Sequence, residues 1–360
     1  MRFQVKNNRS CVSALMAGMA LVGVMLSPLA GLAQGAGGQL SNPAATRAAF
    51  LQMIDRPRVP TAPEIRALPD AGELTYEHFT VAAEPGQRVP GILLKQGGNA
   101  RRPVVVVLHG TGGTKEGQLS LLKTLAGRGF VAVAIDGRYH GERQRGTGSA
   151  SYVEAMLQTY QTGKGHPFLY DTVWDVMRLI DYLETRPDVD AARIGVTGFS
   201  KGGMETYLAA AVDPRIAVAV PMIGVQSFHW ALDNDKWASR VGTFQAAIDG
   251  AAKDAGADKV DAAFVRAFYD RVAPRIYTQF DGPAMLPLIA PRPLLVINGD
   301  SDARTPLPGL QHCIIPAEQA YQKAKAGGKF RLYLQKDTGH TVTEAGLQTA
   351  IDWFVTWLKP

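Results

Sequence analysis

The chain has 360 residues, of which 46% are hydrophobic and 19% are charged, a composition typical of a folded protein with a large core. Its formal charge is +6, but the lysines and arginines are scattered and are not interleaved with aromatic residues. This distribution disfavours nucleic-acid binding, so we expect no nucleic-acid partner.

The first 33 residues have the pattern of a signal peptide. Three basic residues precede an uncharged apolar run over residues 12–29, and the small residues Gly31 and Ala33 fit cleavage before Gln34. A retained membrane anchor is the alternative, but the run is short for a membrane span and contains a proline. We therefore predict export, to the periplasm or the medium, with no stable membrane anchor after cleavage. The mature chain would carry a formal charge of +3.

Residues 34–70 are rich in Ala, Gly and Pro and are predicted to form a loosely structured lead-in, with one short helix around residues 45–54. A regular pattern then extends over residues 71–360. Its first two predicted strands, 74–83 and 89–95, are separated by a turn sequence and favour a hairpin.

Buried strands and amphipathic helices alternate along the rest of the chain. The predicted strands are 104–108, 130–135, 193–197, 216–222, 294–297 and 330–335, and the predicted helices are 119–125, 169–184, 202–211, 317–326 and 343–358. Strands that alternate with helices at this spacing form βαβ units. We therefore predict the α/β class, with a mostly parallel central sheet and helices on both faces.

The segment at about 226–290 interrupts this alternation. It is too long for a structureless loop and contains helix-forming and aromatic residues, which indicates a helical cap inserted into the domain. Its aromatic residues Phe228, Trp230 and Trp237 could line a pocket for an acyl group or a sugar, or could simply hold the cap helices in place.

Residues 198–202 read Gly-Phe-Ser-Lys-Gly and match the G-x-S-x-G pattern. The motif lies between a predicted strand and a predicted helix, which is the context of a nucleophile elbow. A sharp turn there exposes the serine hydroxyl above the sheet. We therefore predict Ser200 as a nucleophile.

A serine hydroxyl needs a base to accept its proton, and seven histidines are available. His340 follows the last predicted strand and precedes the last helix, at the carboxyl end of a parallel sheet, where active sites are built. An orienting acid should precede it in the chain, after a strand. Asp300 and Asp302 both follow strand 294–297, and we favour Asp302, leaving a turn-stabilising role for Asp300.

The glycine-rich loop at residues 108–113, Leu-His-Gly-Thr-Gly-Gly, follows a buried strand and could direct backbone N–H groups at a developing oxyanion. We expect the amides of Thr111 and Lys201 to be these donors. The loop lacks the spacing of phosphate and dinucleotide motifs, and no Cys/His cluster has the spacing of metal ligands. We therefore expect no cofactor and no metal.

With these motifs in place, residues 74–360 resemble the α/β-hydrolase superfamily. The Asp-Gly-Arg-Tyr-His-Gly run at 136–141 and the long helix before the elbow are most similar to the group of acetyl xylan esterases, dienelactone hydrolases and prolyl oligopeptidase catalytic domains. The resemblance implies that Asp136 and Arg138 are structural neighbours of the site. The chain differs from the peptidases because it has no propeller-sized N-terminal domain, and from some members because its elbow carries serine rather than cysteine.

These observations predict an exported serine hydrolase that cleaves a carboxylic ester, with a short acyl group, through an acyl-Ser200 intermediate. The expected substrate is a small-molecule ester or an acylated carbohydrate. A small peptidase or amidase with the same residues is the alternative, and an inactive binding protein is disfavoured by the intact set of Ser, Asp and His. The sequence assigns no oligomeric state and no role to Cys313, the sole cysteine after cleavage.

Overall fold

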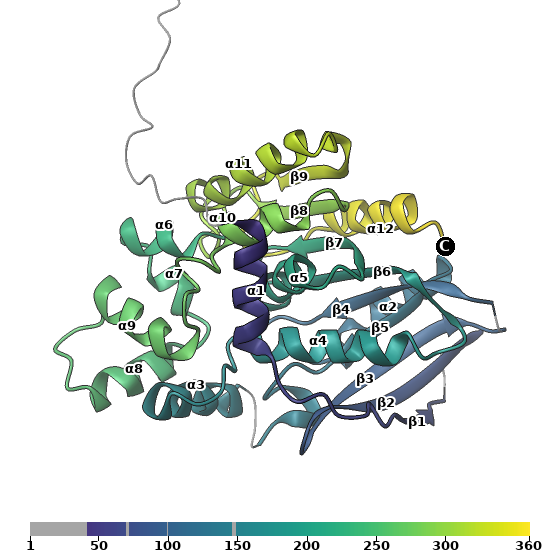
Figure 1. Cartoon of the computed structure of the whole chain (residues 1–360), viewed down its shortest axis with the longest axis horizontal. Coiled ribbons are helices and arrows are strands. Elements are labelled where there is room, and N and C mark those ends of the chain that lie inside the picture. The colour runs from purple at the N-terminus through teal and green to yellow at the C-terminus, as the bar shows by residue number, and fades with distance from the viewer. Residues whose placement is uncertain (1–41, 70–71, 99, 146–148) are drawn as a thin grey trace, which may run out of the picture. The chain divides into compact units, whose positions relative to one another are not determined.

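The computed structural model describes residues 42–69, 72–98, 100–145 and 149–360 (Figure 1). The predicted signal peptide lies outside these residues. The strands are β1 (Glu64–Ala67), β2 (Leu74–Glu84), β3 (Gln87–Gln96), β4 (Arg102–Leu108), β5 (Val131–Ile135), β6 (Val189–Phe199), β7 (Ile216–Met222), β8 (Leu294–Gly299) and β9 (Phe330–Gln335).

These strands form one sheet in the order β1-β2-β3-β5-β4-β6-β7-β8-β9. The pairs β1–β2, β2–β3 and β3–β5 are antiparallel, and every pair from β5–β4 to β8–β9 is parallel. The mostly parallel sheet and the β2–β3 hairpin agree with the prediction. The short exposed strand β1 was not predicted, because it lies in the Pro-rich lead-in and pairs only at the sheet edge.

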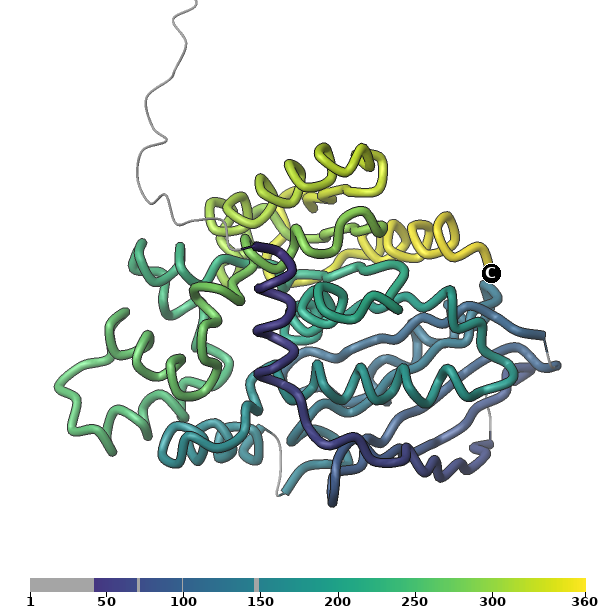
Figure 2. Tube along the Cα trace, in the orientation of Figure 1, coloured from purple at the N-terminus to yellow at the C-terminus, as the bar shows by residue number. Residues whose placement is uncertain are grey.

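The β-branched run of β4 shows why the sheet is covered on both faces. Val104 and Val106 belong to one buried cluster and Val105 and Val107 to the other, since successive side chains of a strand point to opposite faces. The first cluster includes residues of α1 (Pro43–Ile54), α4 (Tyr170–Leu183), α5 (Lys201–Val212) and α11 (Leu307–Lys323), and the second includes residues of α2 (Leu119–Gly127) and α12 (Glu344–Leu358). Figure 2 shows α1 running across α4 and α5.

The predicted helix 317–326 begins ten residues too late. In the structure α11 starts at Leu307 and continues through Pro316, which lies inside the helix. Proline lacks an N–H group and is disfavoured inside a helix, so the sequence does not indicate that the helix continues through Pro316. Packing of Leu310 and Cys313 in the core holds the preceding turns in helical form.

The segment between β7 and β8 is helical. It contains α6 (Phe228–Asp233), α7 (Ala238–Val241), α8 (Gln245–Asp254), α9 (Ala262–Val272), α10 (Gly282–Met285) and the short η3 (Leu286–Ile289). An unpredicted helix, α3 (Ala150–Thr162), packs against α8 and α9. The cap is therefore built from two separate parts of the chain.

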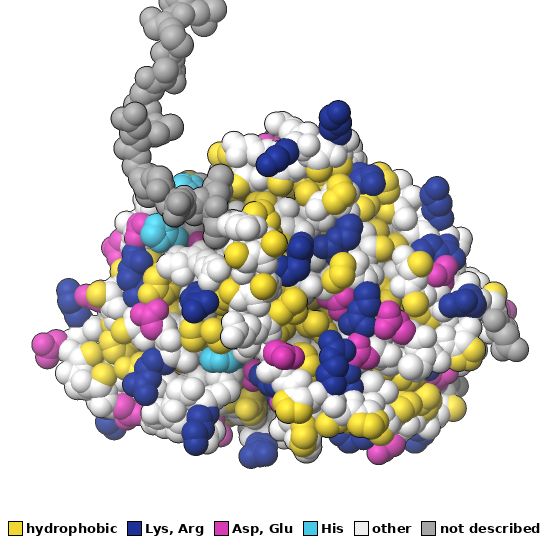
Figure 3. All heavy atoms as spheres, in the orientation of Figure 1, with side chains coloured by type: hydrophobic (Ala, Val, Ile, Leu, Met, Phe, Trp, Pro, Cys, Tyr) yellow, Lys and Arg dark blue, Asp and Glu magenta, His cyan; other side chains and the backbone are white. Residues whose placement is uncertain are grey.

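Among the described helices, none is long and apolar enough to cross a membrane. On the face seen in Figure 3, basic and acidic side chains are interspersed with hydrophobic ones over the sheet and cap elements.

Candidate active site

Ser200 lies at the sharp turn between β6 and α5. Its backbone has φ of 53° and ψ of −111°, a conformation that L-residues rarely adopt. Two hydrogen bonds fix it: the Ser200 amide donates to the carbonyl of Met222 at 2.9 Å, and the Met204 amide donates to the carbonyl of Ser200 at 3.0 Å. The turn therefore depends on β7 as well as on its own helix.

The glycines on either side of Ser200 are required by close packing of the backbone. A Cβ atom at Gly202 would lie 2.3 Å from the carbonyl oxygen of Leu108, and one at Gly198 would lie 2.5 Å from the backbone of Gly202. No side chain fits at these distances. The G-x-S-x-G pattern thus allows β4 and α5 to approach each other directly beneath the serine.

Ser200, His340 and Asp302 are joined by two hydrogen bonds. His340 Nε2 lies 2.8 Å from Ser200 Oγ, and His340 Nδ1 lies 2.7 Å from Asp302 Oδ2. The three residues come from the ends of β6, β8 and β9, which are far apart in the chain but meet at the carboxyl edge of the sheet. A hydroxyl, an imidazole and a carboxylate in this order can pass a proton from the serine to the histidine.

Asp302 is held as an anion by its surroundings. Its side chain is fully buried and accepts hydrogen bonds from the amides of Arg304 and Thr305 and from the Thr305 hydroxyl, at 2.8, 3.2 and 2.7 Å. Burial by itself raises the pKa of Asp302, but the hydrogen bonds from His340 and Thr305 outweigh it, so the pKa is lowered from its ordinary value. A buried carboxylate suits the task of orienting an imidazolium.

Asp300 lies away from the imidazole and stabilises the neighbouring loop. It accepts hydrogen bonds from the amides of Asp337 and Thr338, at 3.0 and 3.1 Å, and so ties the end of β8 to the loop that carries His340. These bonds lower the pKa of Asp300. Of the two aspartates considered from the sequence, the structure therefore brings Asp302 to the histidine.

The glycine-rich loop after β4 lies beside the serine. A Cβ atom at Gly110 would lie 3.3 Å from the carbonyl of Phe199 and 3.7 Å from Ser200 Cβ. Among the described residues, neither the Thr111 amide nor the Lys201 amide has a hydrogen-bond acceptor. The Lys201 side chain is buried in an ion pair with Glu205 at 2.7 Å. The backbone N–H of Lys201 lies next to Ser200 because Lys201 is the following residue.

His109 fixes this loop, a role that the sequence analysis did not assign. Its Nε2 accepts the amide hydrogen of Gly137 at 3.0 Å, so Nδ1 carries the proton, 2.7 Å from the carbonyl of Gly110. Burial and the charge of Lys201 lower the pKa of His109 well below its ordinary value, so the ring is neutral. In the sequence, the position of His109 in the H-G-x-G-G run is the feature that could have indicated this role.

Asp136 and Arg138 take part in buried ion pairs. Asp136 accepts hydrogen bonds from the backbone and the ammonium group of Lys115, both at 2.8 Å, and Arg138 binds both oxygens of Asp175, at 2.8 and 2.9 Å. In the described part of the chain, neither residue forms a hydrogen bond or ion pair with Ser200 or His340.

The aromatic residues considered for substrate binding occupy packing positions. Phe228 is fully buried, with its ring centroid 5.4 Å from that of Tyr269, which agrees with the alternative that it holds the cap helices in place. Trp237 is partly buried against the main core, and the Trp230 ring lies 6.5 Å from that of His312 on α11. Phe228 is covered because α6 packs on α9, a contact that a sequence pattern does not reveal.

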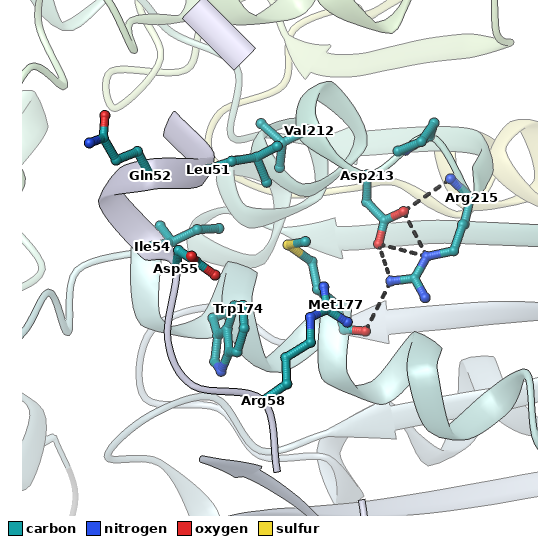
Figure 4. A pocket seen from close by; sticks show the side chains of 11 residues that line it. Leu51, Gln52, Ile54, Asp55, Arg58, Trp174, Met177, Val212, Asp213 and Arg215 are labelled. Carbon is teal, nitrogen blue, oxygen red and sulfur yellow. Dashed lines mark hydrogen bonds and ion pairs between the residues drawn. The ribbon is translucent and has the colours of Figure 1, made fainter. Parts of the chain in front are cut away.

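A surface pocket of about 460 Å³ lies elsewhere (Figure 4). It is lined by residues of α1, by Trp174 and Met177 of α4, and by Val212 to Arg215 at the end of α5. Ser200 precedes the opposite end of this 12-residue helix, about 18 Å away at 1.5 Å per residue. The pocket is therefore not part of the candidate site.

Comparison with known proteins identifies the family. Residues 91–325, well over half of the chain, match the family model described as fungal glucuronyl esterase. The chain belongs to this glucuronyl esterase family. YtaP of Bacillus subtilis (strain 168), which is named as a hydrolase, is 26% identical over 318 residues, covering 81% of this chain and 95% of YtaP. YitV of the same organism, named as an esterase, is 24% identical, covering 71% of this chain and 89% of YitV.

Solved structures show the same fold. Acetyl xylan esterase 1 from Thermoanaerobacterium sp. JW/SL YS485 superposes with a TM-score of 0.62 at 17% identity, covering 88% of this chain and 94% of that one. The glucuronoyl esterase from Solibacter usitatus superposes with a TM-score of 0.58 at 16% identity, covering 86% and 91%. This glucuronyl esterase family member thus has the α/β-hydrolase fold, and it is a serine hydrolase that cleaves carboxylic esters.

Proposed function

We propose that Ser200, His340 and Asp302 are the catalytic residues of this esterase and that it hydrolyses an ester through an acyl-Ser200 intermediate. The observation that carries the proposal is the continuous hydrogen-bonded chain from Ser200 Oγ through both nitrogens of His340 to the buried carboxylate of Asp302. This arrangement matches the geometry required of nucleophile, base and orienting acid.

In the proposed reaction, His340 Nε2 accepts the hydroxyl proton while Ser200 Oγ bonds to the carbonyl carbon of the ester. The backbone N–H groups of Thr111 and Lys201 stabilise the oxyanion that forms. His340 then donates the proton to the oxygen of the leaving alcohol as the C–O bond breaks. A water molecule repeats these steps on the acyl-serine, releasing the acid and restoring the hydroxyl.

We propose an ester carried by a carbohydrate, with a short acyl group, as the substrate. A relative from Sodiomyces alcalophilus, named 4-O-methyl-glucuronoyl methylesterase 1, is 35% identical over 77 residues, although the match covers 21% of this chain and 16% of that protein. This name refers to a uronoyl ester, and the name of the structural neighbour acetyl xylan esterase 1 refers to acetylated xylan. Both names support a carbohydrate ester as the substrate.

The test is hydrolysis of a p-nitrophenyl ester series, from acetate to dodecanoate, by the protein without residues 1–33 and by its Ser200→Ala variant. We expect rapid turnover of the short esters and a loss of at least about 10³-fold in the variant, because the nucleophile is absent. Labelling of the wild type, but not of the variant, by a fluorophosphonate would identify Ser200 directly. Equal turnover by the two proteins would refute the assignment.

We also propose that residues 1–33 are removed during export. The support is the basic and apolar pattern of these residues together with the small residues before Gln34. N-terminal sequencing of the protein recovered from outside the cytoplasm should begin at Gln34. Recovery of the protein with an intact N-terminus in the membrane fraction would favour a retained anchor.

A further inference from the structure

Arg240 is a buried arginine without a carboxylate partner. Three arginines of the described residues are more than nine-tenths buried, with exposed fractions of 6% for Arg138, 4% for Arg178 and 7% for Arg240. Arg138 pairs with Asp175, and Arg178 pairs with Asp181. Arg240 forms no ion pair with any described residue, and its side chain makes one hydrogen bond, from Nε to the Ser239 hydroxyl at 3.2 Å.

The two terminal nitrogens of Arg240 are available to a ligand. They donate no hydrogen bond to the described part of the chain. Neither of them is among the fully buried polar atoms that lack a partner, so each retains some accessible surface. The guanidinium group is therefore not completely enclosed, although the residue as a whole is buried.

Arg240 lies beside α6, and the loop that precedes this helix contacts the elbow. Its guanidinium carbon is 5.3 Å from the centre of the Phe228 ring, at the start of α6. The loop just before Phe228 packs on the elbow, since a Cβ atom at Gly224 would lie 2.4 Å from the carbonyl of Ser200. The acidic groups whose charges act on Arg240 include Asp302, the acid of the site.

The acidic group Asp281 does not neutralise Arg240. Asp281 also acts on its charge, but the Asp281 carboxylate accepts hydrogen bonds from the Ser227 hydroxyl and from the amides of Phe228 and His229, and it forms no ion pair with Arg240. Burial accordingly lowers the pKa of Arg240, whereas carboxylates outweigh burial and raise the pKa of Arg138. An arginine nevertheless stays protonated in proteins, so a positive charge is buried without an ion-pair partner among the described residues.

A buried charge without a partner lowers stability, and such charges are commonly kept for binding. We propose that Arg240 is a carboxylate-binding residue of the substrate site, so that the enzyme prefers esters whose acyl or alcohol part carries a free carboxylate. This inference rests on the proposed function of Ser200. A planar guanidinium with two free nitrogens is suited to bind both oxygens of a carboxylate.

The test compares anionic esters with neutral esters of the same shape. One pair, mono-4-nitrophenyl adipate and its terminal amide, places the charge on the acyl part, and the other, 4-acetoxybenzoate and 4-acetoxybenzamide, places it on the alcohol part. We expect wild type to have a higher kcat/KM for the anionic member of at least one pair. In Arg240→Met this ratio should fall ten-fold or more, mainly through KM. The affected pair identifies the part of the substrate that binds Arg240.

Stability measurements separate this role from a structural one. Removing a buried charge that has no ion-pair partner should leave the melting temperature of Arg240→Met unchanged or higher. The matched variant Arg178→Met removes a paired arginine, so it should melt at a lower temperature yet keep the wild-type ratio. A lower melting temperature of Arg240→Met together with an unchanged ratio would overturn the proposal.

Ligand binding keeps the inference testable apart from catalysis. In the Ser200→Ala background, adipate or 4-hydroxybenzoate should raise the melting temperature, and the added Arg240→Met substitution should abolish that rise. Equal shifts in both proteins would refute the carboxylate site. If wild type cleaves none of the esters while this difference persists, the proposed catalytic function fails and the carboxylate site stands.

Discussion

The two aspartates after β8 show how surroundings separate residues of one type. Asp302 is buried and its oxygens contact His340 and the Thr305 hydroxyl, whereas Asp300 is bound to the amides of the loop that carries the histidine. A carboxylate at the first position can stabilise an imidazolium. A carboxylate at the position of Asp300 can only hold the loop in place.

Replacing each aspartate by asparagine tests this difference at the residue scale. We expect Asp302→Asn to lower kcat for p-nitrophenyl acetate by about 10³- to 10⁴-fold, because an amide neither stabilises the imidazolium nor holds the required tautomer. Asp300→Asn keeps one acceptor oxygen for the loop amides and should lower kcat less than about ten-fold. Similar losses in the two variants would contradict the assignment of Asp302.

At the scale of elements, the proposed active site depends on how closely α5 lies to β4. The first turn of α5 contacts the end of β4 with no side chain between them, since Gly202 lies against the carbonyl of Leu108. This contact places the Ser200 turn next to the glycine-rich loop that follows β4. The elbow and the predicted oxyanion loop are therefore positioned by one backbone contact.

A methyl group at Gly202 should break that contact. We expect Gly202→Ala to lower the free energy of unfolding by about 3 kcal/mol, measured by urea denaturation, because the added carbon would overlap the Leu108 carbonyl. The matched variant Gly127→Ala lies on the exposed end of α2 with no atom within 4 Å of the new carbon. The free energy of unfolding of Gly127→Ala should equal that of wild type or exceed it by up to about 1 kcal/mol. A stable Gly202→Ala protein would show that the elbow can relax.

At the scale of the whole described fold, a buried ionic cluster joins the antiparallel and parallel parts of the sheet to a helix. Asp175 of α4 binds Arg138 at 2.8 Å and Arg143 at 2.6 Å, and Arg138 also binds Glu84 of β2 at 2.6 Å. The arginines come from the loop after β5, where Asp136 and His140 also lie. Burial raises the pKa of Asp175, but the two arginines outweigh it and lower that pKa below its ordinary value.

Removing the shared carboxylate should destabilise the protein. We expect Asp175→Asn to lower the free energy of unfolding by about 3–5 kcal/mol at pH 7, because Arg138 and Arg143 lose their shared buried carboxylate and, among the described residues, only Arg138 keeps another, Glu84. A lowered folded pKa means that this stabilisation is complete above the unfolded value of about 4 and is lost as the pH falls through the folded value. The difference between wild type and variant, measured by urea denaturation, should therefore shrink below about pH 4.

An exposed ion pair provides the control for this prediction. Lys336 lies 3.8 Å from Asp337, and both side chains are more than four-fifths exposed. Lys336→Gln should leave the melting temperature unchanged, since solvent screens such pairs. A difference for Asp175→Asn that did not change with pH would indicate that packing, rather than charge, causes the loss.

The sequence by itself determined the class of fold, the elbow and the chain order of Ser200, Asp302 and His340. Buried strands, helix periods and the G-x-S-x-G motif are local patterns, because each depends on residues that lie close together in the chain. Only the tertiary structure showed that α3 packs against the cap helices, that the His109 ring accepts a hydrogen bond from the Gly137 amide and that Phe228 is buried in the core. It alone showed that Arg240 is buried without a partner. Burial and pairing depend on residues far apart in the chain, so no local pattern contains them.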